Sequence, residues 1–554
     1  MARKTKAAVS SELSQTFEKS RRPSLYPVPD SHKHVSIQAG AGCGKTTTME
    51  WGYRANIKRE SCPFIPSDAQ VAIMDQFSGV SPAAKVGFFC FNKSIATEFL
   101  DRGLPGCTNH SHGFAAVRNY YPRIRVNGDY RVLNLIEKEG INFKKDWELG
   151  KLLQKVTSLA KVNLLGWSPG MSPEQVGSSS TWESDFCNLI NHYGIDLNGK
   201  DSQVMTLVPR LLQGCATTLH ELDYDDMIWL PIVRDMKVDG YDEVIVDERQ
   251  DLNLAQLELL KKTALTNEGR MSGVGDENQA IYGFSGASAE AFSLMTAWMD
   301  TTRRGCIPLR LMETRRCPKA VVALAQTLIS DFRALPEAPE GRVVRGVTWD
   351  QLLGLTAHTS LGSEMAARPG DMLLCRVNAP LVQMAYRFIR AGIKANIQGR
   401  DLGNGILSLV KKSKQDTIPT LLRWAEDHQA QEEAKVLASK FPSDAKLGAI
   451  EDKYLCLRHL CEGCDSISDL TTRIETIFQD RFDRSKTVLL SSVHRAKGLE
   501  AERVFILCPE KMPLPMKNPQ PWELVQERNL QYVAWTRSKD TLVFTTTPAR
   551  SERE

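Results

Sequence analysis

A glycine-rich loop followed at once by lysine and threonine is the stretch whose residue types point most clearly to chemistry. It reads AGAGCGKTT, the spacing of a phosphate-binding loop with alanine in place of the first glycine. In such a loop backbone N–H groups cradle phosphate oxygens, while Lys45 reaches the β- and γ-phosphates and the Thr46 hydroxyl binds Mg²⁺. The loop therefore predicts a bound nucleoside triphosphate, contacted by Ala39, Gly40, Ala41, Gly42, Cys43, Gly44, Lys45, Thr46 and Thr47.

Two carboxylates at the end of an apolar run supply the partners that such a loop needs. In YDEVIVDERQD, the run of residues 244–246 precedes Asp247 and Glu248. Asp247 is the predicted magnesium ligand, and Glu248 is predicted to take a proton from the water that attacks the γ-phosphate. The alternative, an acidic turn exposed to water, is disfavoured directly after three β-branched residues.

These side chains require strands and helices at particular places. Val35 and Ile37 indicate a short strand that leads into the loop, and a helix is expected to begin at Lys45. The run 244–246 is typical of a strand buried on both faces, as in parallel sheets. Together these elements predict an α/β fold with parallel sheets and disfavour the alternative of a plain glycine turn at residues 39–47.

Length and charge set wider bounds. A chain of 554 residues is expected to form three or four compact units. The net charge of +4 is too small to indicate a polyanionic partner, so any nucleic-acid groove has to be local. We expect residues 1–30, which contain Pro23, Pro27 and Pro29, to be flexible.

The composition favours an intracellular protein, cytoplasmic by expectation, with the nucleus left open. No apolar window approaches the roughly 18 residues of a membrane span, and the N-terminus lacks the apolar core of a secretion signal. The 13 cysteines are scattered and odd in number, which fits a reducing compartment, and we expect most of them to be small core residues.

Further motifs follow in a definite order, of which GDENQAIYGFSGA at 275–287 is the most specific. The others are FFCFNKSIATEF (88–99), TNHSHGF (108–114), DYDDMI (223–228), DERQDLN (247–253), LMETRRCP (311–318), SVHRAKGLE (492–500) and QERNLQYVAWTR (526–537). This series resembles the UvrD/Rep/PcrA-like DNA helicases of superfamily 1, with phage and F-box DNA helicases as the relatives nearest in character.

The resemblance implies two RecA-like domains with ATP and Mg²⁺ bound between them. It implies that Gln279 senses the γ-phosphate, that Arg316 and Arg537 reach the phosphates from the second domain, and that Arg315 and Glu500 contact the nucleotide. A surface ion pair remains the alternative for Arg316 and Arg537. The apolar runs around Arg537, YVAW and TLVFTT, predict a strand that holds its side chain near a buried sheet edge.

The resemblance also implies a set of DNA contacts. Phe284 is the expected stacking residue, with core packing as its alternative. For His110 and His494 a structural role is the alternative. The implied set is Asn92, Lys93, Thr108, His110, Tyr282, Phe284, Ser492 and His494.

The positions of the motifs predict how the chain is divided. Each motor domain is expected to be interrupted by a mainly helical insertion. The predicted ranges are 31–115 and 206–305 for the first motor domain, 116–205 for its insertion, 306–400 and 483–554 for the second motor domain, and 401–482 for its insertion.

Two departures from the relatives concern the nucleotide base. Pro27 stands where relatives carry a glutamine that reads adenine, and Arg315 stands in place of a base-stacking tyrosine. A guanidinium stacks on a purine differently from a phenol ring. We therefore expect a relaxed preference among nucleotides.

A cluster of sulfur and nitrogen side chains in CLRHLCEGC invites a metal interpretation. Its members are Cys456, His459, Cys461 and Cys464. They are closer together than the two separated ligand pairs of a usual zinc site, and the intervening leucines suit a helix that ends near Gly463. The helix is the preferred interpretation, and zinc is the alternative.

The combined expectation is an ATP-dependent DNA helicase that acts as a monomer, moves 3′→5′ on single-stranded DNA and unwinds forked DNA. One alternative is a translocase that displaces proteins without unwinding. Another is a nucleotide-switched DNA-binding subunit, although the presence of Lys45, Glu248 and Arg537 counts against it. RNA as the track stays open, as does the pathway, whether replication, repair or recombination.

Overall fold

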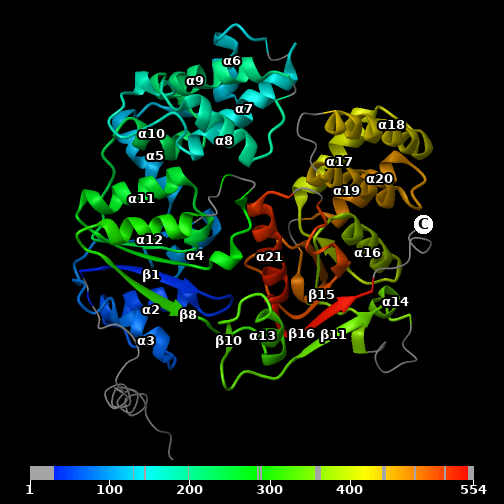
Figure 1. Cartoon of the computed structure of the whole chain (residues 1–554). Helices are drawn as coiled ribbons and strands as arrows, with labels where there is room; N and C mark the ends of the chain where they lie inside the picture. Colours follow the sequence, from blue (N-terminus) through cyan, green and yellow to red (C-terminus); the bar gives the residue numbers. More distant parts are fainter. Residues whose placement is uncertain are drawn as a thin grey trace, which may run out of the picture.

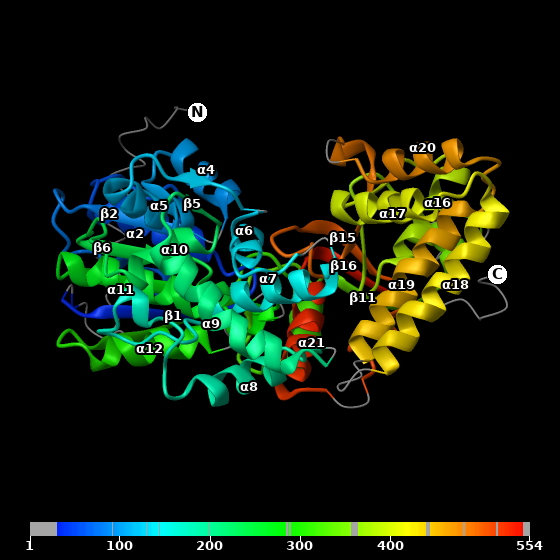
Figure 2. The ribbon, with the colours of Figure 1, turned by 90° about the horizontal axis from the view of Figure 1, so that it is seen from above.

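The computed structural model describes residues 30, 32–90, 92–128, 130–142, 145–197, 199–283, 286, 290–355, 364–438, 444–479, 482–516 and 519–546. Phe284 and nearly all of the segment 1–30 lie outside these residues. Two α/β halves stand side by side, each with a group of helices above it (Figure 1). Seen from above, helix α21, Pro521–Trp535, lies between the halves (Figure 2).

The first half is built on a six-stranded parallel sheet in the order β3-β2-β6-β7-β1-β8. Strand β6 is buried along its whole length, as the run 244–246 predicts. Strand β8 pairs with β1, although the boundary predicted at residue 305 assigns β8 to the second domain. The strands are β1 His34–Ala39, β2 Val86–Cys90, β3 Gly106–Thr108, β6 Glu243–Val246, β7 Arg270–Gly275 and β8 Cys306–Leu311.

Helices cover both faces of this sheet, with α11 and α12 above it and α2 and α3 below it in Figure 1. Helix α2 begins at Lys45, as predicted from the phosphate-binding loop. The elements are α2 Lys45–Asn56, α3 Asp68–Asp75, α4 Lys93–Asp101, α11 Leu254–Thr266, α12 Ala291–Thr301 and the short 3-10 turns η2 Arg249–Asp251 and η3 Glu277–Gln279.

Helices α5 to α10 form the group above the first sheet and share one apolar core. Helix α9 runs across the boundary predicted at residue 205, and its Val208 and Leu212 lie in this core, so the helical region extends further than that boundary. The elements are α5 Asn109–Tyr120, β4 Arg125–Val126, α6 Arg131–Lys138, α7 Trp147–Val162, η1 Pro173–Gln175, α8 Trp182–His192, α9 Asp201–Thr217, β5 Glu221–Leu222 and α10 Asp226–Val233.

The second half repeats the design with a six-stranded parallel sheet in the order β11-β16-β15-β12-β14-β13. The run YVAW, predicted as strand, ends helix α21 instead, and β16 begins just after Arg537. The elements are β9 Glu313–Thr314, α13 Lys319–Ala325, β10 Arg333–Ala334, β11 Arg342–Val347, α14 Trp349–Leu352, β12 Met372–Cys375, α16 Ala379–Arg390, β13 Ala395–Ile397, η5 Arg484–Lys486, β14 Val488–Ser492, β15 Ala501–Ile506, η6 Pro509–Lys511 and β16 Ser538–Thr545.

Four helices form the group above the second sheet: α17 Arg400–Ser413, α18 Ile418–Leu437, α19 Asp444–Cys461 and α20 Ile467–Ile477. The cysteine and histidine cluster lies at the end of α19, where Cys456 and Cys461 are buried and His459 Nδ1 is 2.6 Å from the Glu462 carboxylate. Within the described ranges, no three His, Cys, Asp or Glu side chains are grouped to hold a metal ion. The helix is therefore what the structure contains at this cluster.

Two expectations from composition concern the cysteines and the absence of a membrane-spanning segment. All 13 cysteines are free thiols, and eight of them are buried, in agreement with a role as small core residues. Among the residues that the structure describes, no helix is long and apolar enough to cross a membrane.

Candidate functional site

The phosphate-binding loop connects β1 to α2 and has the backbone that its glycines permit. Gly42 and Gly44 have φ angles of 67° and 78°, in the left-handed region. A side chain at Gly42 would also place its Cβ 2.5 Å from the Cβ of Arg316. Glycine is therefore required at residue 42 by the backbone and by the close approach of the second half.

The predicted catalytic side chains of the first half meet at this loop. The Thr46 hydroxyl donates to Asp247 Oδ2 at 2.6 Å, and Lys45 Nζ lies 3.2 Å from Glu248 Oε1. Oxygen ligands are what Mg²⁺ prefers, and it needs few from protein when phosphates and waters supply the others. The adjacent hydroxyl and carboxylate of Thr46 and Asp247 thus fit a magnesium site.

Burial and neighbouring charges shift the pKa values of Asp247 and Glu248 in opposite directions. Burial and the nearby negative charge of Glu248 raise the pKa of Asp247. Burial also opposes the ionisation of Glu248, but the ammonium groups of Lys45 and Lys497 outweigh it and lower the pKa of Glu248. Glu248 also has a φ of 51°, which is strained for a residue with a side chain and holds its carboxylate at the loop.

The second half contributes Arg537, which is 1% exposed and lies close to the catalytic groups. Its Nη2 donates to Gln279 Oε1 at 3.2 Å, while Gln279 Nε2 donates to Asp276 at the end of β7 at 2.6 Å. Burial, followed by the charge of Arg316, lowers the pKa of Arg537 to about 9. The alternative of a surface ion pair therefore does not describe Arg537.

Arg316 is different, because its Nε donates to Glu500 Oε2 at 2.7 Å and it is only partly buried. Its Nη1 also donates to the Thr536 carbonyl at 3.3 Å. Glu500, predicted to contact the nucleotide, is thus paired with a predicted phosphate-binding arginine, and it also pairs with Lys539 at 2.5 Å.

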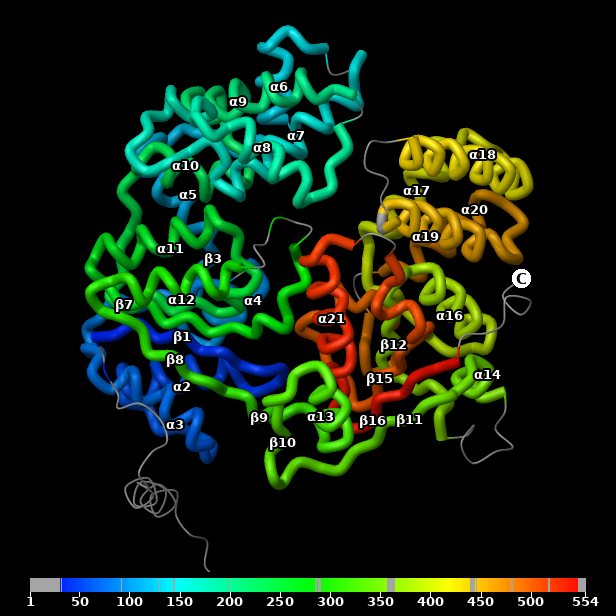
Figure 3. Tube along the Cα trace, in the orientation of Figure 1, coloured from blue at the N-terminus to red at the C-terminus, as the bar shows by residue number. Residues whose placement is uncertain are grey.

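Backbone groups of the loop are held from the second half. The Ala41 N–H donates to the Tyr532 hydroxyl at 2.9 Å, and the Arg315 N–H donates to the Gly42 carbonyl at 2.9 Å. Tyr532 belongs to α21, which runs along the side of the second half that faces the first (Figure 3). The loop therefore lies in a closed contact between the two halves.

Lys497 forms a further bridge between the halves. Its Nζ lies 2.6 Å from Asp251 Oδ2 and donates to the Gln279 carbonyl at 2.8 Å. The same ammonium group lies 5.1 Å from the ring centroid of Tyr282. Lys497, which follows β14 of the second sheet, thus contacts the first half at Asp251 and in the segment from Gln279 to Tyr282.

Sequence reasoning missed Gln70 on α3. Gln70 forms a capping box with Ser67; its Oε1 accepts from Arg315 Nη2 at 2.6 Å and its Nε2 donates to Thr48 at 2.9 Å. The order SDAQ at 67–70, a capping signature, was the available signal. No local sequence pattern predicts the hydrogen bond between Gln70 and Arg315, which is 245 positions away. Tyr532 and Lys497 lay inside quoted motifs without a predicted role.

Two residues predicted to contact DNA have local structural roles. The side chain of Asn92 caps α4 by accepting from the Ile95 N–H at 2.9 Å, and Thr108 caps α5 by accepting from the Ser111 N–H at 3.1 Å. Lys93 is exposed at the start of α4, and His110 is half-buried, which lowers its pKa.

The remaining predicted DNA contacts meet across the halves. The Tyr282 hydroxyl donates to the His494 carbonyl at 3.4 Å. Burial lowers the pKa of His494 to about 3, so its imidazole is neutral near pH 7. Ser492 ends β14, two positions before His494. Phe284 falls outside the described residues, so its role stays a prediction.

Two family models match this chain. The UvrD/REP helicase N-terminal domain matches residues 102–298, and the UvrD-like helicase C-terminal domain matches residues 376–549. The phosphate-binding loop precedes the first matched range. The two ranges fall in the first and second halves of the molecule, respectively, and together cover more than half of the chain.

Similar proteins carry related descriptions. A probable DNA helicase of Mycoplasma pneumoniae is 25% identical over 404 residues, which is 63% of this chain and 70% of that protein. The ATP-dependent DNA helicase UvrD2 of Mycobacterium tuberculosis is 26% identical over 60% of this chain and 52% of its own length. The ATP-dependent DNA helicase Rep of Escherichia coli is 23% identical over 35% of this chain and 28% of its own length.

Proposed function

Because the chain belongs to the UvrD/Rep family of superfamily 1 helicases, we propose that it is an ATP-dependent DNA helicase. In this proposal it moves 3′→5′ on single-stranded DNA as a monomer and separates the strands of forked DNA. A nearer kinship with phage and F-box DNA helicases is part of the same proposal. The observation that carries it is that one phosphate-binding loop is held from both halves, by Tyr532 and Arg315 of the second half and by Glu248 of the first, which pairs with Lys45.

The proposed reaction begins with ATP bound in the loop. Thr46 and Asp247 would hold a magnesium ion, which when bound neutralises negative charge on the phosphates. Lys45 pairs with Glu248 in the structure, and a γ-phosphate that binds Lys45 competes with this pair. Glu248 would then lose one of the two ammonium groups that lower its pKa, become more basic and accept the proton of the attacking water.

The second half would complete the site. Arg537 approaches through Gln279 and stabilises negative charge that develops on the γ-phosphate, as an arginine supplied across a cleft does in other phosphoryl transfers. Hydrolysis would then depend on the contact between the halves, and binding and release of the nucleotide would rearrange the bonds that form it. A strand lying across both halves would be moved by this cycle.

A short path would connect hydrolysis to DNA. Gln279 is three positions from Tyr282, and Lys497 contacts both the carbonyl of Gln279 and the ring of Tyr282. A shift of the second half therefore displaces the predicted DNA side at the same time as the phosphate side. The proposed motor requires coupling of this kind.

The steady-state ATPase rate tests the proposal when measured without nucleic acid and with single-stranded DNA, duplex DNA or single-stranded RNA. We expect strong stimulation by single-stranded DNA that is lost in Lys45→Ala. A rate that no nucleic acid changes would contradict the motor. Duplexes with a 3′ or a 5′ tail then separate helicase from translocase, because only a 3′→5′ helicase unwinds the 3′-tailed duplex.

A further inference from the structure

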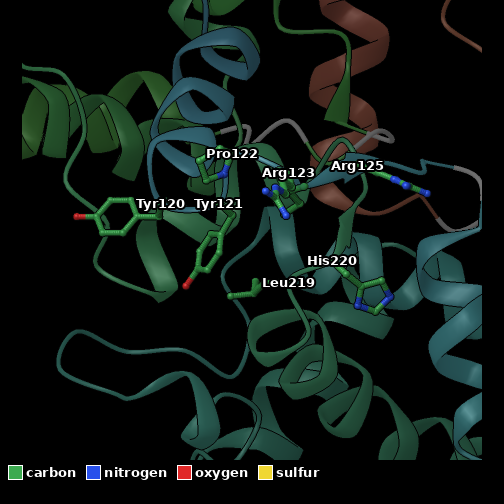
Figure 4. A pocket seen from close by; sticks show the side chains of 8 residues that line it. Tyr120, Tyr121, Pro122, Arg123, Arg125, Leu219 and His220 are labelled. Carbon is green, nitrogen blue, oxygen red and sulfur yellow. The ribbon is translucent and has the colours of Figure 1, made fainter.

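A pocket of about 610 Å³ lies where α5 ends, outside the site described above (Figure 4). It is lined by residues 120–125, which end α5 and begin β4, and by Leu219 and His220 just before β5. The pairing of β4 with β5, together with a bond from the Arg125 N–H to the His220 carbonyl at 3.2 Å, joins its two walls. The pocket is thus supported by regular structure on both sides.

Aromatic and basic side chains are arranged at opposite ends of this pocket. Figure 4 shows Tyr120 and Tyr121 on one side and Arg125 and His220 on the other, with Arg123 between them. The rings of Tyr120 and Tyr121 are 6.5 Å apart, and Tyr120 is 51% exposed. The lining contains no carboxylate.

The two arginines at this pocket are not neutralised by nearby acids within the described residues. Arg123 and Arg125 are exposed, and within the described part of the chain neither forms an ion pair. The third basic group, His220, has its Nε2 3.8 Å from Glu221 Oε1, and this carboxylate also accepts hydrogen bonds from Asn127 at 2.6 Å and Asn134 at 2.9 Å. A chain with a net charge of only +4 therefore concentrates unpaired positive charge here.

One further guanidinium lies beside the tyrosines. The guanidinium of Arg234 lies 5.8 Å from the ring centroid of Tyr121, and the backbone N–H of Lys237 holds the Tyr120 hydroxyl by donating to it at 3.0 Å. Aromatic rings beside unpaired guanidinium groups are the combination that grips single-stranded nucleic acid, through base stacking and phosphate contact.

We propose that this pocket is a second contact for single-stranded DNA, in which Tyr120 or Tyr121 stacks on a base and Arg123 and Arg125 hold the flanking phosphates. The proposal rests on the DNA-translocating function inferred above. Helix α5 links the two contacts, because His110 lies in its first turn and Tyr120 ends it. Its 12 residues span about 18 Å, or about five nucleotides of stacked single strand.

The test compares wild type with Arg123→Ala/Arg125→Ala in the full chain, using labelled oligothymidylates of increasing length at several salt concentrations. We expect weaker binding of long oligonucleotides only, because short ones fill the motor contact without reaching the pocket. The slope of log affinity against log salt should fall by about 1.4 when two phosphate contacts are lost. Tyr121→Ala should weaken binding of long oligonucleotides by about 5- to 100-fold if Tyr121 provides the stack.

Control variants separate this effect from a loss of charge or of fold. Arg303→Ala/Arg423→Ala removes the same charge at two exposed positions away from the pocket and should retain the wild-type slope. Arg123→Lys/Arg125→Lys should largely restore it. ATP hydrolysis without DNA should be equal in all of these variants.

Two outcomes would overturn the pocket, and they are distinguishable. If wild type binds DNA and the pocket variants match the control in slope and length dependence, the pocket is not a contact and the proposed function stands. If wild type binds no single-stranded DNA at any length, the proposed function fails and the pocket proposal fails with it.

Discussion

The two six-stranded sheets share a parallel design but present different chemistry to each other. The first carries an ammonium group and carboxylates at the carboxyl ends of its strands: Lys45 after β1, Asp247 and Glu248 after β6, and Asp276 after β7. The second presents Arg537 and Tyr532, both from the end of α21 and the turn into β16. The first half thus holds the carboxylates together with Lys45, and the second half presents the guanidinium of Arg537.

This difference teaches that neither half is a complete site. An apolar cluster containing Ile37 and Ile245 of the first sheet extends to Met372 and Val504 of the second, so the halves share packed surface as well as polar contacts. A site divided in this way ties chemistry to the contact between halves. Substituting residues of each half in turn measures how much each half contributes to ATP hydrolysis.

Loss of the cation should have the largest effect. Arg537→Ala should reduce kcat for DNA-stimulated ATP hydrolysis by about 10³- to 10⁵-fold, because the charge on the γ-phosphate loses its partner from the second half. Arg310→Ala, an exposed arginine on β8, is the matched control and should hydrolyse ATP normally. A loss below tenfold for Arg537→Ala would mean that Arg537 does not supply this charge.

Loss of the base on the first half should come next. Glu248→Gln should lower kcat by about 10²- to 10⁴-fold while nucleotide binding is retained, since only proton acceptance is removed. Stopped-flow binding of a fluorescent nucleotide, together with phosphate release, separates the two steps. Glu258→Gln on α11 is the control, and an equal loss there would point to a general disturbance of the fold.

The bridge between the halves should matter less than the reacting groups. Lys497→Met leaves the buried Asp251 without its partner, and we expect a 10- to 100-fold fall in stimulated hydrolysis, since such unpaired charges cost about 3–5 kcal/mol and part of that appears as weaker closure. Lys497→Met/Asp251→Leu should recover part of the rate. Strictly additive losses in this double-mutant cycle would show that the pair is not coupled.

The base side of the cleft should give the smallest effect. Gln70→Ala frees the Arg315 guanidinium, and KM for ATP, GTP and CTP should rise together by about three- to tenfold. Gln256→Ala removes a similar capping-box side chain on α11 and should leave KM unchanged. In wild type, a preference for ATP above about 100-fold would contradict the relaxed preference expected from Pro27 and Arg315.

Local patterns in the sequence predicted much of the fold. The α/β class, the strand before the phosphate-binding loop, the helix starting at Lys45 and the buried strand before Asp247 are confirmed, because each depends on neighbouring residues. The strand predicted at YVAW was wrong. A short apolar run reads the same in a buried helix, and α21 is buried over these residues between the two halves.

Contacts between distant segments were beyond the sequence patterns. Arg537 is 258 positions from Gln279, and Tyr532 is 491 positions from Ala41. The packing of whole sheets decides which side chains meet at such separations. The local spacing of apolar residues in the sequence does not predict these contacts. The same reason explains why β8 joins the first sheet: its partner β1 lies near the start of the chain.

The bond between the Tyr532 hydroxyl and the Ala41 N–H has a consequence for how long the proposed motor would stay on DNA. Ala41 is predicted to donate to a phosphate, so the tyrosine and the phosphate compete for one donor. When the phosphate leaves, the Tyr532 hydroxyl would replace it as the acceptor of the Ala41 N–H. The second half would then bind the loop as the product departs. For the proposed motor, we expect halves that exchange bonds to the loop in this way to keep the DNA enclosed between turnovers, which would favour processivity.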